Sequence, residues 1–65
     1  MREKIIKSLI AHAKGHIEKH KANVEILLQK IAGVAEHPDM ITTIDGELEK
    51  LATAQDKLNT LSELK

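Results

Sequence analysis

The sequence predicts an all-α protein, an antiparallel two-helix hairpin with helices at about 3–32 and 38–64. Apolar residues recur in alternating steps of four and three along both halves of the chain, which is the spacing of packed helices. A Gly and a Pro, Gly33 and Pro38, separate the two halves. Residues 1–65 therefore form one helical-hairpin domain, and we expect it to dimerise into a four-helix bundle.

The first helix is predicted from an unbroken seam that faces a partner helix. Its members are Ile6, Ile10, Ala13, Ile17, His20, Val24, Leu27, Ile31 and Val34. One polar residue, His20, interrupts this apolar line. A single polar residue in a seam can fix helix register or oligomer state at some cost in stability, so His20 is our candidate for a specificity element. A partly exposed position at the edge of the bundle is the alternative.

The connection is predicted from residues that end and begin helices. Gly33 suits the position just after a helix, which closes the first helix at about residue 32. Pro38 suits the first turn of the next helix, because its missing amide hydrogen is not needed there. Asp39 follows it, where a carboxylate is favoured by the positive end of the helix.

The second helix is predicted from a similar seam. Its members are Ile41, Ile44, Leu48, Leu51, Gln55, Leu58 and Ser62. Two antiparallel registers remain open. If the first helix ends at Gly33, His20 lies opposite Leu48, whereas a helix continuing through Gly33 places His20 opposite Gln55. Polar matching favours the second register, and the chemistry of the connection favours the first, which we adopt.

Further apolar residues lie beside the seams and predict a second interface between copies of the chain. These oligomer-interface candidates are Ile5, Leu9, Ile26, Leu28, Met40 and Leu61. The chain has 65 residues, no Cys and no aromatic residue, so a lone hairpin has few ways to gain stability. We therefore expect a homodimer or higher oligomer, with a host or viral protein as a further partner.

Charge and composition narrow the function classes. Residues 1–36 carry seven basic and four acidic residues, and residues 37–65 carry three and six, so the halves are +3 and −3 and favour packing together. No apolar run approaches the roughly 20 residues that cross a bilayer, so we expect a soluble, cytoplasmic protein with no membrane partner. Two long helices predict no substrate pocket, and we expect neither enzyme activity nor a cofactor.

Several segments resemble small uncharacterised helical proteins encoded by tailed phages of the T-even type and their marine relatives. These segments are residues 13–17 (AKGHI), 20–25 (HKANVE), 33–37 (GVAEH) and 44–48 (IDGEL). The resemblance covers most of the chain and implies a location in the host-cell cytoplasm, but it implies no activity or functional residue. In size and layout the chain is also similar to the plasmid regulator Rop, a hairpin that dimerises into a four-helix bundle and binds RNA. That likeness is architectural analogy, and fold does not imply function.

Two exposed sets of residues supply the remaining hypotheses. His12 and His16 are four residues apart, a spacing that lets two imidazoles reach one metal ion. We interpret them as solvated residues beside the seam and predict no metal site, with metal binding as the alternative. We expect the chain to be a protein-interaction or structural/regulatory module. An RNA- or DNA-binding regulator is the alternative, because basic residues gather along one edge of the first helix. They are Arg2, Lys4, Lys7, Lys14 and Lys21.

Overall fold

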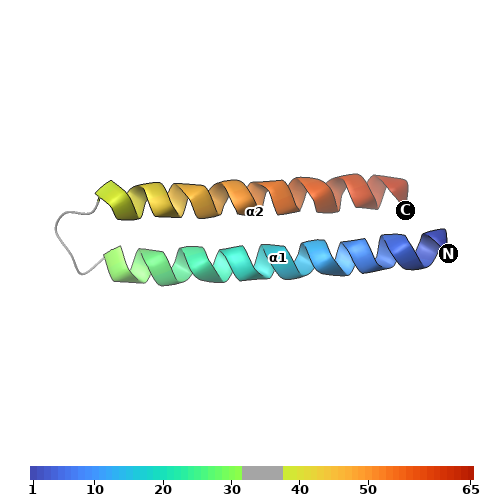
Figure 1. The fold of residues 1–65 in the computed structure, drawn as a ribbon, viewed down its shortest axis with the longest axis horizontal. Coiled ribbons are helices and arrows are strands. Elements are labelled where there is room, and N and C mark those ends of the chain that lie inside the picture. Colours follow the sequence, from blue (N-terminus) through green and yellow to red (C-terminus); the bar gives the residue numbers. More distant parts are fainter. Residues whose placement is uncertain (32–37) are drawn as a thin grey trace.

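The computed structural model describes residues 1–31 and 38–65, which form two helices lying antiparallel along their whole length (Figure 1). Helix α1 spans Arg2–Ile31 and helix α2 spans Pro38–Leu64. The amino and carboxyl termini meet at one end of a rod that measures 52 × 14 × 12 Å. The predicted all-α hairpin is confirmed, and the helix bounds lie within about one residue of those predicted. The predicted stop at Gly33 lies outside the described residues.

Helix α1 forms on the predicted seam. Ala13, Ile17 and His20 are buried against α2, and the other seam positions between Ile6 and Ile31 are half-buried. Glu3 in the first turn and Lys30 in the last turn complement the helix dipole. The side chain that the sequence marked as exceptional, His20, therefore faces the partner helix with 6% of its surface exposed.

Helix α2 packs on a seam in which every second predicted position is replaced by the residue just before it. Ile44, Leu51 and Leu58 are half-buried as predicted. The alternate positions were predicted wrongly, because Ile41, Leu48, Gln55 and Ser62 are exposed. The seam instead uses the residues immediately before them, Met40, Glu47, Ala54 and Leu61.

The physical reason for this rotation is that both lines have the same spacing, so periodicity alone does not choose between them. The observed line brings a carboxylate, Glu47, to the buried imidazole of His20. It also places the small residue Ala54, which is 5% exposed, opposite Ala13, which is 4% exposed, so that the helices approach closely.

The register between the helices is fixed by two contacts. Arg2 donates a hydrogen bond of 2.8 Å from its guanidinium to the backbone carbonyl of Leu64 at the ends of the helices. Near the middle, His20 meets Glu47. Both contacts agree with the register adopted from the chemistry of the connection, and the alternative register, with His20 opposite Gln55, is wrong.

The core between two helices is thin. Its buried apolar residues are Ala13, Ile17 and Ala54. Several large apolar side chains remain outside it, with 44 to 64% of the surface of Ile5, Leu9, Ile26, Leu28, Ile41, Leu48 and Leu64 exposed. Neither described helix contains an apolar stretch long enough to cross a membrane.

Candidate functional site

A polar cluster lies inside the hairpin, between the middle of α1 and the first half of α2. Nδ1 of His20 and Oε2 of Glu47 are 2.6 Å apart, and Asn23 donates from its side-chain amide to the same oxygen over 3.3 Å. Because a carboxylate only accepts hydrogen bonds, Nδ1 of His20 carries the proton in this contact. The cluster therefore joins the helices through a buried, directional interaction.

Glu47 is held as a carboxylate by this cluster. The hydrogen bonds from His20 and, next, from Asn23 lower its pKa below the ordinary value of 4.5, and they outweigh the opposing effect of desolvation. Lys50, one turn further along α2, lies 3.9 Å from Oε1 and adds a weaker attraction. The candidate residue His20 thus has an ionised partner. Sequence reasoning missed Glu47, although the need to pair a buried imidazole was a signal for it.

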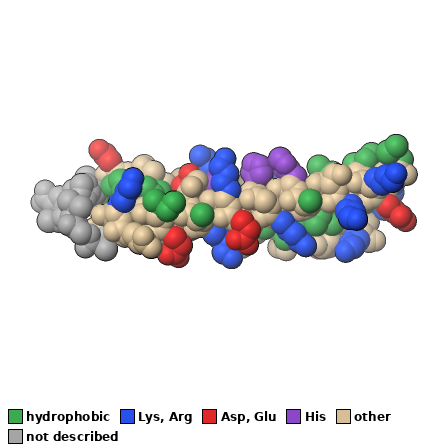
Figure 2. Space-filling model, turned by 90° about the horizontal axis from the view of Figure 1, so that it is seen from below, with side chains coloured by type: hydrophobic (Ala, Val, Ile, Leu, Met, Phe, Trp, Pro, Cys, Tyr) green, Lys and Arg blue, Asp and Glu red, His purple; other side chains and the backbone are tan. Residues whose placement is uncertain are grey.

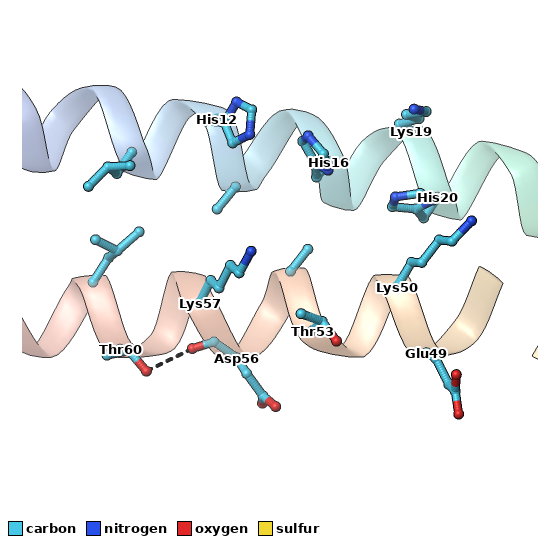
Figure 3. A pocket seen from close by; sticks show the side chains of 14 residues that line it. His12, His16, Lys19, His20, Glu49, Lys50, Thr53, Asp56, Lys57 and Thr60 are labelled. Carbon is cyan, nitrogen blue, oxygen red and sulfur yellow. Dashed lines mark hydrogen bonds between the residues drawn. The ribbon is translucent and has the colours of Figure 1, made fainter. Parts of the chain in front are cut away.

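A groove follows one side of the hairpin and exposes a row of titratable groups (Figure 3). It has a volume of about 1030 Å³. His12 and His16 lie on its α1 wall, with their ring centroids 4.4 Å apart and the planes tilted by 44°. Lys50 and Lys57 extend toward α1 from the α2 wall, whereas Glu49 and Asp56 point away from it. The groove is therefore bordered by imidazoles and ammonium groups.

The surroundings of His16 disfavour its charged form. Desolvation at the helix surface lowers its pKa from 6.5, and the positive charges of His12, Lys19, His20 and Lys57 lower it further. A neutral imidazole at neutral pH can act as a hydrogen-bond partner or a metal ligand. Among the described residues, no group of three or more His, Cys, Asp or Glu side chains is arranged to hold a metal ion.

The six oligomer-interface candidates occupy three kinds of position. Ile5, Leu9 and Ile26 share the side of α1 that carries His12 and His16, because the same alternating spacing of four and three connects them. Leu28 lies on the opposite side of α1, in line with Lys7, Lys14 and Lys21. Met40 and Leu61 are half-buried on the seam of α2.

The exposed apolar side chains form two groups when the register is applied to both helices. The terminal patch consists of Ile5, Leu9 and Leu64 on the histidine side, near the chain termini. Figure 2 shows apolar surface at this end, along the same edge as the histidines. The second group, the distal patch, consists of Leu28, Ile41 and Leu48 on the other side and at the other end. The chain thus presents apolar surface at diagonally opposed places.

The basic candidates gather near the termini. Arg2, Lys7 and Lys14 line a second groove of about 530 Å³, together with Lys65, which sequence reasoning had not included. The acidic residue in this lining is Glu3. Lys4 and Lys21 are exposed but do not line the groove. The structure therefore brings together three of the five basic residues singled out from the sequence.

Comparisons of the chain with protein families, with curated proteins and with solved structures found no match.

Proposed function

We propose that this protein is a protein-interaction module that works as a small oligomer, assembled by burying the exposed apolar surface of one hairpin against a second copy. The observation that carries this proposal is the set of large apolar side chains that the hairpin leaves outside its own core. Six of them form the terminal and distal patches.

The surface area supports the same conclusion. The hairpin exposes 5170 Å². Compact folded monomers expose a surface that scales with about the 0.73 power of their mass, and this relation gives about 4100 Å² for a chain of this mass. The excess is roughly 1000 Å², and a standard interface covers about 800 Å² on each partner. One additional interface per chain therefore removes the surplus that two helices alone leave exposed.

The zero net charge of the chain is compatible with a second copy as the occupant. Each chain has equal numbers of basic and acidic residues, so copies do not repel each other through a net charge. In the register, Leu28 lies opposite Ile41 and Lys21 lies opposite Leu48, so a basic residue borders the distal patch, as Arg2 borders Leu64 in the terminal patch. Apolar groups of this kind are typical of the centres of protein interfaces.

Sedimentation equilibrium tests the proposal, with a chelator present so that metal ions do not contribute to association. We expect a mass of at least two chains, and we expect Leu28→Gln combined with Leu48→Gln to shift the equilibrium toward the monomer. Ile26→Gln is the matched control, because Ile26 is 54% exposed but lies outside both patches. A wild-type chain that stays monomeric at millimolar concentration would refute self-association.

A second candidate function, binding of RNA or DNA, is favoured by the groove near the termini. Arg2, Lys7, Lys14 and Lys65 supply four positive charges along one concave surface, against a single carboxylate from Glu3. Phosphate groups are attracted to such a surface without any requirement for base contacts. We keep this function as the alternative, because the sequence has no Phe, Tyr or Trp on which bases stack.

A further inference from the structure

We propose that His12 and His16 form half of a binding site for a divalent transition metal, with zinc as the reference ion, and that the same two residues of a second copy complete it. The inference does not depend on association without metal. It extends the proposed function by giving one surface of the hairpin a chemically defined partner.

The spacing of the two imidazoles carries the first step. Their ring centroids are 4.4 Å apart on adjacent turns of α1. Two imidazoles bound to one zinc ion, with zinc to nitrogen distances of about 2.0 Å and tetrahedral angles, place their centroids about 5 Å apart. Both side chains are exposed, so a small rotation of each ring reaches this geometry without disturbing the core. The pair is therefore close to a chelating arrangement.

The number of ligands carries the second step. Zinc in structural sites takes four ligands, and one hairpin supplies two here. The next histidine along the helix, His20, is unsuited as a third ligand, because it is buried and its Nδ1 is committed to Glu47. Two copies related by a twofold axis supply two plus two imidazoles. The site is incomplete without the second chain.

The neighbouring residues indicate how the copies meet. Ile5 and Leu9 continue the line of His12 and His16 toward the termini, and both are about half exposed. A twofold axis parallel to α1 brings each of these apolar residues to its own counterpart while the four histidines converge. Burial of this apolar surface adds to the metal bonds. The metal then selects the histidine side of the hairpin as an interface.

The electrostatics of the groove limit the affinity for a cation. Lys19, Lys50 and Lys57 line the same groove as His12 and His16 and place positive charge near the two rings. The same lysines repel a cation, and Glu49 and Asp56 point away from the groove. Neutralising Lys19 should therefore strengthen zinc binding while leaving both ligands in place.

Sedimentation equilibrium and zinc titration calorimetry on the full chain test the site. We expect zinc to double the mass found with chelator and to bind in a ratio of one zinc ion to two chains. His16→Gln should abolish both effects. Lys19→Gln is the matched control, which retains both ligands and should bind zinc at least as tightly. Circular dichroism checks that each variant keeps the helical content of the wild type.

Two results would overturn the inference: an absence of zinc binding, or binding of one zinc per chain without a change in mass. An increase in mass that persists in His16→Gln would show that the second chain is recruited without these ligands, which also contradicts the inference. Association of the wild type in chelator bears on the proposed function instead, so the two proposals fail independently.

Discussion

Nδ1 of His20 lies 2.6 Å from Oε2 of Glu47, which makes a polar contact between two helices whose other seam residues are apolar or small. His20 is 6% exposed, and Asn23 donates a further hydrogen bond to the same carboxylate. An imidazole buried without a partner loses its hydrogen bonds to water, which costs about 1 to 3 kcal/mol. A slipped register incurs that cost, so the pair discriminates between registers even if it adds little net stability.

The first prediction is a double-mutant cycle on this pair. We expect His20→Leu and Glu47→Leu each to lower the free energy of unfolding by about 1 to 3 kcal/mol, because each leaves the other polar group buried without its partner. The double variant should recover most of that loss or exceed the wild type, since two leucines fill the layer. Urea unfolding followed by circular dichroism measures all four proteins. Additive losses in the double variant would show that the pair is not coupled.

The second prediction concerns acid. Hydrogen bonds from His20 and Asn23 lower the pKa of Glu47 in the folded chain below its ordinary value of 4.5. The stabilisation is therefore complete above that ordinary value and is lost as the pH falls through the lower, folded-state pKa. Between pH of about 6 and about 3, the wild type should lose more stability than Glu47→Gln.

The control for the acid experiment is another glutamate of α2. Glu49 is exposed and points away from α1 (Figure 3), so Glu49→Gln should retain the acid sensitivity of the wild type. Equal acid sensitivity in Glu47→Gln and the wild type would contradict the assignment of this effect to the buried pair.

The pair also shows how far the sequence alone could lead. The periodicity predicted both helices, the burial of Ile17 and the exceptional position of His20, because those features depend on one helix at a time. It did not distinguish Glu47 from Leu48 on the seam of α2, since a one-residue rotation keeps the spacing. The choice depends on the contact with His20 across the hairpin, which periodicity within one helix does not encode.

The two apolar patches were predictable only in part for a related reason. Ile5, Leu9, Ile26 and Leu28 were correctly read as lying beside the seam, and each is 44% exposed or more. Their division between opposite sides of the hairpin follows from the register with α2, which brings Leu64 beside the first group. A patch that combines residues of both helices can be defined only when the register between the helices is known.

The third prediction is that Gly15→Ala stabilises the hairpin. Gly15 lies within α1, and a Cβ atom added there would meet no other atom within 4 Å. Because alanine loses less backbone entropy than glycine in a helix, we expect a gain of about 1 kcal/mol in the free energy of unfolding. Thermal and urea unfolding measure it. A loss of stability would contradict the prediction.

The fourth prediction concerns the basic groove and decides between the two candidate functions. If the groove binds nucleic acid, a fluorescent 20-base-pair RNA duplex should bind at low salt, and the logarithm of the association constant should fall linearly with the logarithm of salt concentration. Lys7→Gln combined with Lys14→Gln removes two charges from the groove lining, so the slope should become shallower by about 2.

The matched control for this experiment is Lys21→Gln, which removes one exposed charge in line with Lys7 and Lys14 but outside the groove. Lys21→Gln should change the salt dependence less than the loss of Lys7 or of Lys14. Those two lysines share the groove lining with Arg2 and Lys65, so a phosphate there meets several positive charges at once. Fluorescence anisotropy at several salt concentrations measures each protein. No binding at low salt would eliminate the nucleic-acid function.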